Sequence, residues 1–201
     1  MRTAMKNHRI STICRLALTS MLLIPASVSA QEALSAAASM ISDTALAGAQ
    51  GRVGLNMAAG DANVQANSAA LAIGEFARAT SSVDQTLDAT KLRAPSTAVA
   101  VITDRAFSNA AGLISVNQAS GTGNLQVNSL AIGLGSHAEA VSESRLSAIT
   151  TRATPKGVDG NRTRSAVIAD TAFEGARGLV QVNQAAGSGN STANHFALIV
   201  Q

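Results

Sequence analysis

The chain has 201 residues, of which 46% are hydrophobic, and a formal net charge of +3 at pH 7. The hydrophobic fraction consists largely of alanine, and the aromatic residues are four phenylalanines without Trp or Tyr. Alanine buries little apolar area, so a single compact core would gain little free energy against the cost of ordering the backbone. The composition therefore argues against an ordinary globular domain of this length.

Residues 1–30 have the form of a secretory signal peptide: a basic start, an apolar segment at 16–24 and a small-x-small sequence ending at Ala30. The apolar segment is shorter than the roughly 20 residues that span a bilayer, which favours a signal peptide over a membrane anchor. Its removal leaves eleven basic and twelve acidic residues, a net charge of −1, so no nucleic-acid partner is expected. Cys14 is the single cysteine, so the mature chain has neither a disulfide nor a cysteine-based metal site or nucleophile.

The rest of the chain is organised around three imperfect copies of one unit. An N-terminal segment, 31–42, comes first, and the copies begin 61 and then 66 residues apart. Because the copies keep the same Asp, Gly and Asn positions in register, a single structural unit has been duplicated. The copies occupy 43–74, 104–133 and 170–201, with linkers at 75–103 and 134–169.

Each copy predicts a strand, a tight turn and a second strand. In the second copy Ile114 and Val116 alternate with Ser115 and Asn117, which is the period of two that is typical of a strand. Glycines that permit positive φ, followed by Asn, then indicate a turn. The predicted core positions are Val53, Leu55, Phe107, Ile114, Val116, Phe173, Val180 and Val182.

The linkers continue the alternating pattern. A third strand with alanine on one face is predicted at 77–83 and 138–144, and a fourth at 98–102 and 165–168. The intervening segments, 86–97 and 147–163, contain proline and scattered charges, which favours exposed loops. A short helix over 33–41 competes with a strand there, since this segment is rich in helix formers. The predicted fold class is all-β, with three repeats of about 61–66 residues forming stacked layers of a β-solenoid or cross-β kind.

Such a unit cannot bury its apolar face alone, so we expect the units to stack on one another or on other chains. In-register stacking at about 4.8 Å lets identical amide side chains form hydrogen-bonded ladders. Alternatively, the asparagines serve only to satisfy backbone groups at turns. The predicted assembly residues are the repeated asparagines and turn glycines, Asn56, Asn63, Asn67, Asn117, Asn124, Asn128, Asn183, Asn190, Asn194, Gly60, Gly121 and Gly187.

Copies of the form A-x-G-x-[VI]-x-V-N-x-A-[AS]-G-x-G-N-x-x-x-N in an exported chain resemble the Fap functional-amyloid fibril proteins of bacterial biofilms. The resemblance implies a secreted fibril subunit at the cell surface or outside the cell, which passes through the periplasm and an outer-membrane export pore. It also implies assembly with itself and homologous subunits, and matrix polysaccharide is a further candidate partner. The major subunits of that family carry a Cys-x-x-Cys that this chain lacks, so a minor subunit, a nucleator or a fibril-associated adhesin stays open.

Other site chemistries have weaker support. The repeated Asp43, Asp104 and Asp170 lack the carboxylate cluster of a calcium site, and His137 and His195 have no partner at metal-ligand spacing. No pattern marks a catalytic site or a cofactor site, so we expect no enzyme and no cofactor. A monomeric β-solenoid adhesin that binds a surface or glycan is the alternative function. The sequence contains one basic stretch, which comprises Arg145, Arg152, Lys156, Arg162 and Arg164. It is interpreted as a solvated loop that discourages unwanted strand pairing, and the alternative is a binding site for anionic matrix polymers.

Overall fold

The computed structural model describes residues 36–88, 90, 94–149 and 162–201, and all its strands lie within one compact unit, 34–201. The described part of the chain contains eleven strands and no helix. The predicted signal peptide and most of the second predicted loop lie outside the described residues. The strands are β1 (Ala36–Ile41), β2 (Gln50–Ala59), β3 (Val64–Ile73), β4 (Arg78–Asp88), β5 (Thr97–Ile102), β6 (Ala111–Thr122), β7 (Leu125–Leu134), β8 (Glu139–Ile149), β9 (Thr163–Ile168), β10 (Arg177–Ser188) and β11 (Ser191–Val200).

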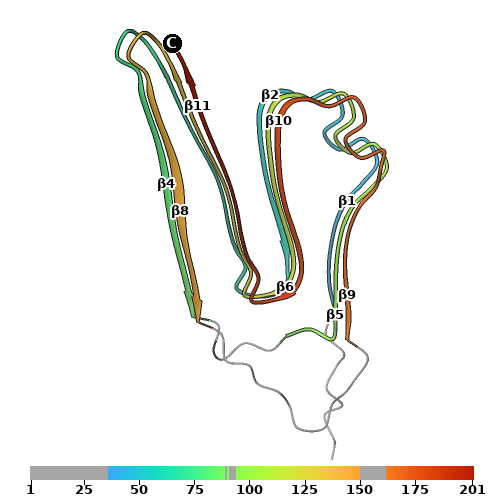
Figure 1. The fold of residues 1–201 in the computed structure, drawn as a ribbon. Helices are drawn as coiled ribbons and strands as arrows, with labels where there is room; N and C mark the ends of the chain where they lie inside the picture. Colours follow the sequence, from blue (N-terminus) through green and yellow to red (C-terminus); the bar gives the residue numbers. More distant parts are fainter. Residues whose placement is uncertain (1–35, 89, 91–93, 150–161) are drawn as a thin grey trace, which may run out of the picture. The chain divides into compact units, whose positions relative to one another are not determined.

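The strands form four parallel sheets, in which each strand pairs with its counterpart from another repeat. Three sheets have three strands, in the orders β1-β5-β9, β2-β6-β10 and β3-β7-β11, and the fourth pairs β4 with β8. Figure 1 shows the members of each sheet running side by side along their length. We call β1–β4 layer 1, β5–β8 layer 2 and β9–β11 layer 3. The three layers therefore stack within one chain, which the repeats alone left undecided.

The pairing keeps the register of the sequence repeat. Asn117 pairs with Asn56 below it and Asn183 above it, and Asn128 pairs likewise with Asn67 and Asn194. The partners in these pairs are 61 and 66 residues apart, the two offsets between the copies. The all-β prediction of stacked strand–turn–strand layers is confirmed.

The structure decides one alternative that the sequence left open, and it shows that one expectation was wrong. The segment considered for a helix contains β1, because parallel pairing with β5 and burial of Ala37, Ser39 and Ile41 outweigh a modest helix propensity. The segments after the third strands begin as strand and not as loop, since β4 runs to Asp88 and β8 to Ile149 in continuous register.

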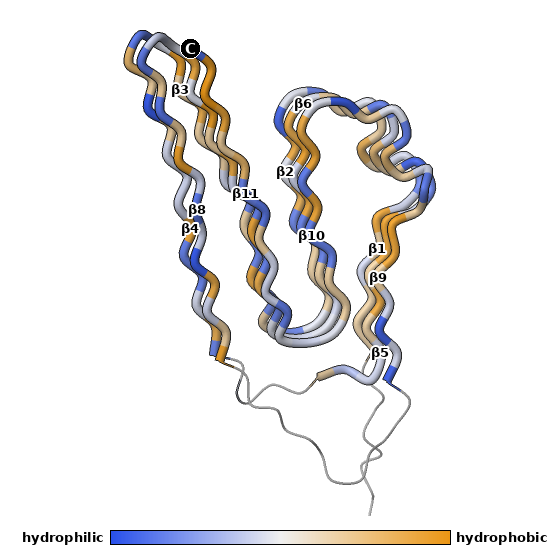
Figure 2. Tube along the Cα trace, in the orientation of Figure 1, coloured by the Kyte–Doolittle hydropathy of each residue, from blue (hydrophilic) through white to orange (hydrophobic). Residues whose placement is uncertain are grey.

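The apolar core lies between the β1-β5-β9 sheet and one face of the β2-β6-β10 sheet. Phe107, Ile114 and Val116 are almost completely buried there, and the Phe107 ring stacks on Phe173 with centroids 4.7 Å apart. Figure 2 shows the same hydropathy recurring from layer to layer along each sheet. Val53, Leu55, Phe173 and Val182 are partly buried against this cluster.

Val180 lies in register with Ile114 but is 37% exposed, because it belongs to layer 3, whose outer side is uncovered. The neighbouring positions show the same trend. Ile168 is 43% exposed, whereas its layer 2 partner Ile102 is fully buried. Burial therefore depends on the layer as well as on the position within the repeat.

Candidate functional site: amide ladders and two open edges

The opposite face of β6 looks towards β7, and the space between these sheets holds a group of amide side chains that includes Asn117 and Asn128. The alternation of the strand decides this division, because successive side chains point to opposite faces. Gln118 donates to the Val101 carbonyl on the β5 side, whereas Asn117 next to it donates to the Ala66 carbonyl on the β3 side. The β5 side of β6 thus combines aliphatic side chains with the Gln118 amide, and the β7 side holds the Asn117 amide.

Three asparagine ladders run through the layers. In the first, Asn117 Nδ2 donates to Asn56 Oδ1 at 2.9 Å, and Asn183 Nδ2 donates to Asn117 Oδ1 at 3.0 Å. In the second, which connects Asn67, Asn128 and Asn194, both steps are 2.9 Å. In the third, at the turns, Asn124 donates to Asn63 at 2.8 Å and Asn190 donates to Asn124 at 2.7 Å. In all six steps the higher layer donates to the lower one.

The first two ladders also bond to each other within every layer. Asn128 Nδ2 donates to Asn117 Oδ1 at 3.1 Å and to the Val116 carbonyl at 3.0 Å. Asn67 and Asn194 repeat the same pattern in layers 1 and 3. The asparagines therefore join neighbouring sheets as well as neighbouring layers, and such a network is costly to break where it is buried.

The turn ladder combines amide stacking with backbone contacts. Asn124 Nδ2 also donates to the Gly187 carbonyl at 3.1 Å, and Asn63 Nδ2 donates to the Gly121 carbonyl at 3.0 Å. Gly121 has a φ of +124°, and a Cβ at this position would clash with the Gly187 carbonyl oxygen. The close stacking of the turns therefore requires glycine here. Gly60 approaches the Gly121 carbonyl in the same way.

The predicted residues omitted two glutamine contacts of the same kind. Gln65 Nε2 donates to Gln126 Oε1 at 2.7 Å, and Gln184 Nε2 donates to Gln118 Oε1 at 2.9 Å. Each pair occupies one repeat position in only two of the three copies, with Thr192 and Met57 in the remaining copy. The signal was therefore present in the sequence but incomplete.

The ladders are completely buried in layer 2 and, apart from the buried Asn183, more accessible in the outer layers. Asn117, Asn124 and Asn128 of layer 2 are completely buried, whereas Asn56 of layer 1 is exposed and Asn194 of layer 3 is half-buried. An open groove on the layer 3 side runs between β10 and β11 and is lined by residues that include Gln181, Asn194 and Phe196. The two end layers thus present unpaired strand edges together with the ends of the ladders.

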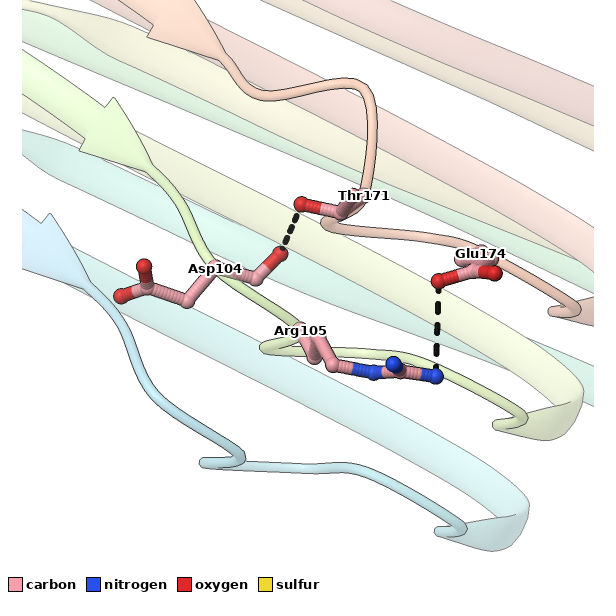
Figure 3. A network of polar contacts seen from close by, with 4 residues as sticks. All are labelled: Asp104, Arg105, Thr171 and Glu174. Carbon is pink, nitrogen blue, oxygen red and sulfur yellow. Dashed lines mark hydrogen bonds and ion pairs between the residues drawn. The ribbon is translucent and has the colours of Figure 1, made fainter.

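Polar contacts also connect layers 2 and 3 at the corner that follows the β1-β5-β9 sheet, as Figure 3 shows. The Arg105 guanidinium lies 3.4 Å from the Glu174 carboxylate, and the Thr171 hydroxyl donates to the Asp104 carbonyl. Asp104 also accepts the backbone N–H of Asp43 at 3.0 Å. Asp104 therefore takes part in interlayer hydrogen bonding at this exposed corner, towards layer 1 and towards layer 3.

The described residues offer little support for other kinds of functional site. No group of three His, Cys, Asp or Glu within the described ranges is placed to hold a metal ion. In the same ranges, no helix is long and apolar enough to cross a membrane. The pKa of the Asp88 carboxyl is lowered because the Thr90 backbone N–H donates to it at 3.0 Å, but this pair belongs to the turn after β4 and not to the ladders.

A comparison with protein families agrees with the resemblance noted in the repeats. The model of the functional amyloid protein FapB/FapC family matches residues 25–201, which include all three repeats and every asparagine of the ladders. No solved structure matches the chain.

Proposed function

Since the chain belongs to the functional amyloid protein FapB/FapC family, we propose that it is a secreted structural subunit of extracellular fibrils in a biofilm matrix. In this proposal, layer 3 of one copy stacks on layer 1 of the next, and homologous subunits add in the same way. The observation that carries it is the register of the asparagine ladders, which run through all three layers and stop at the uncovered sides of layers 1 and 3.

The two outer layers are complementary. Within the chain, each layer donates its asparagine Nδ2 groups to the Oδ1 atoms of the layer below. On an added copy, Asn56 and Asn67 would donate to Asn183 and Asn194 of the copy beneath and so extend both ladders. Such a head-to-tail contact joins two different surfaces and does not close, so repetition produces a filament.

Parallel strand pairing would extend with the ladders. A docked copy would place β1, β2 and β3 on β9, β10 and β11, continuing three sheets whose members already pair in register. Strands would then follow one another at the 4.7–4.9 Å spacing of neighbouring β-strands. The result would be a cross-β fibril in which each copy supplies three layers.

The test is assembly of residues 31–201, a range that includes every described strand. We expect this chain, without denaturant, to form fibrils with a reflection near 4.7 Å along the fibre axis, thioflavin fluorescence and seeded growth. A stable, monodisperse, β-rich monomer that fibrils of a homologous subunit do not seed would contradict the proposal.

One observation favours the alternative of a monomeric adhesin. The three layers already stack within a single chain, so burial of Phe107 and the central asparagines does not depend on a second copy. An adhesin would remain monomeric in the assembly experiment and bind a surface or a glycan such as matrix polysaccharide. Sedimentation of the chain with and without polysaccharide distinguishes this outcome from fibril formation.

A further inference from the structure

We propose that Arg52 and Arg164 cap the two open ends of the layer stack and must move before a second copy can dock. The inference rests on the proposed head-to-tail assembly and describes how it is controlled. Both arginines depart from the residue type that their register partners use: Leu113 and Leu179 for Arg52, and Ala37 and Ala98 for Arg164.

At the layer 1 end, Arg52 Nη2 donates to the Asn67 carbonyl oxygen at 3.3 Å. The Val64 N–H points to layer 2, since it donates to the Asn124 carbonyl. Backbone groups of successive residues in a strand alternate in direction, so the Asn67 carbonyl, three residues later, points away from layer 2. Arg52 therefore occupies an acceptor on the outer edge that a docking β11 strand would require.

At the layer 3 end, the Arg164 side chain lies across the turn glycine Gly187. Its Cδ and Nε atoms are 2.8 and 2.9 Å from the position that a Cβ on Gly187 would take. At the equivalent place above Gly121, the same position is filled by the Gly187 carbonyl of the next layer. Arg164 thus occupies the space that the Gly60 carbonyl of an added copy would enter.

The Arg164 side chain cannot leave Gly187 for the protein interior without a cost in free energy. Ala37 and Ala98, its register partners, are 5% and 1% exposed, so the inner side of this column accommodates methyl groups. Docking of a second copy would either bury the guanidinium there or force it out to solvent, and burying an unpaired charge is costly. Cations at an open strand edge are a known means of discouraging edge-to-edge pairing.

The consequence is that the contact between two copies is weaker than the contacts between layers of one chain. Within the chain, each contact between layers includes one of these arginines: Arg52 pairs with Leu113 of layer 2, and Arg164 pairs with Ala98 of layer 2. Layer 3 of one copy would instead meet layer 1 of the next with both arginines in the same contact. The arginines then keep the folded chain soluble until its concentration or a seed drives docking.

The experiment uses residues 31–201 with Arg164→Ala, Arg52→Leu and the double substitution, each introducing the residue that the same column already contains. We expect each single variant to lower the soluble concentration in equilibrium with fibrils by about tenfold and to speed seeded elongation, and the double variant to do more. Arg177→Ala is the matched control, since it removes one exposed layer 3 charge that does not lie over Gly187. We expect it to change the soluble concentration by less than about twofold, as for other exposed surface charges.

Equal effects of Arg164→Ala and Arg177→Ala would overturn the cap at layer 3 and leave only a net-charge effect. An unchanged soluble concentration for both single variants would overturn the inference while leaving the fibril proposal intact, provided that the wild type forms cross-β fibrils. Absence of fibrils from the wild type and from every variant would refute the assembly proposal and the caps with it. Variants that assemble where the wild type does not would support the caps directly.

Discussion

Replacement of Asn117 by alanine should be the most destabilising change in the ladders. The Asn117 side chain donates to Asn56 Oδ1, the Ala66 carbonyl and Asn67 Oδ1 at 2.8–3.0 Å. It accepts from Asn128 Nδ2 at 3.1 Å and from Asn183 Nδ2 at 3.0 Å. The residue is completely buried, so water cannot readily replace these partners.

The magnitude follows from these contacts. A typical hydrogen bond contributes about 1 kcal/mol net, and a buried partner left unsatisfied costs about 1–3 kcal/mol. The two amide hydrogens share three acceptors, so roughly four bonds are lost, and neighbouring amides recover part of the loss by pairing with each other. We therefore expect Asn117→Ala to lower the free energy of unfolding by about 3–5 kcal/mol.

Asn56→Ala is the matched control, because it removes the same group from the same ladder in the exposed outer layer. Asn56 accepts from Asn67 and Asn117, both at 2.9 Å, and water can reach it in the folded chain. Its loss should cost about 1–2 kcal/mol. The assay is guanidinium unfolding of residues 31–201 followed by far-ultraviolet circular dichroism. Equal losses for the two variants, or a loss below about 1 kcal/mol for Asn117→Ala, would refute the view that the buried ladder holds the layers together.

Three further substitutions test other parts of the stack. Phe107→Ala should lower the free energy of unfolding by about 3–5 kcal/mol, because it empties a fully buried position and removes the ring stacked on Phe173. Phe76→Ala is the control: this side chain is 75% exposed, so its loss should cost less than about 1 kcal/mol in the same denaturation experiment. Gly121→Ala should abolish cooperative unfolding or cost more than about 3 kcal/mol, since its methyl group would meet the Gly187 carbonyl. Gly48→Ala is the control, because Gly48 also has a positive φ but no atom lies within 4 Å of the new methyl group; it should cost about 1 kcal/mol. Similar losses for the two variants would contradict the close approach of the turns. Asn194→Ala, in layer 3, should leave monomer stability within about 1–2 kcal/mol of wild type yet raise the soluble concentration over fibrils about tenfold, and an unchanged soluble concentration would show that this ladder does not continue between copies.

The repeat made much of this structure predictable. Because Asn56, Asn117 and Asn183 recur at one position between residues that alternate with period two, parallel in-register strands were the simplest arrangement that places like residues together. The glutamine pairs were harder to predict, since Met57 and Thr192 interrupt their columns and a position shared by two copies stands out less than one shared by three. The local sequence could not decide between a helix and a strand at Ala36–Ile41. The strand depends on pairing with β5, sixty-one residues away, and intrinsic helix or strand propensity does not reflect so distant a partner.

By itself, the sequence determined the unit: its strand period, its turn glycines and the register of its asparagines, all of which follow from local spacing repeated three times. Only the tertiary structure decided where each unit lies in the stack, and that position controls what a residue experiences. Ile114 is buried and Val180 exposed at the same repeat position because one has a layer on each side and the other does not. The same reason distinguishes Arg164 from the alanines of its column: a charge can lie at an uncovered edge, and no local pattern shows which edge stays uncovered.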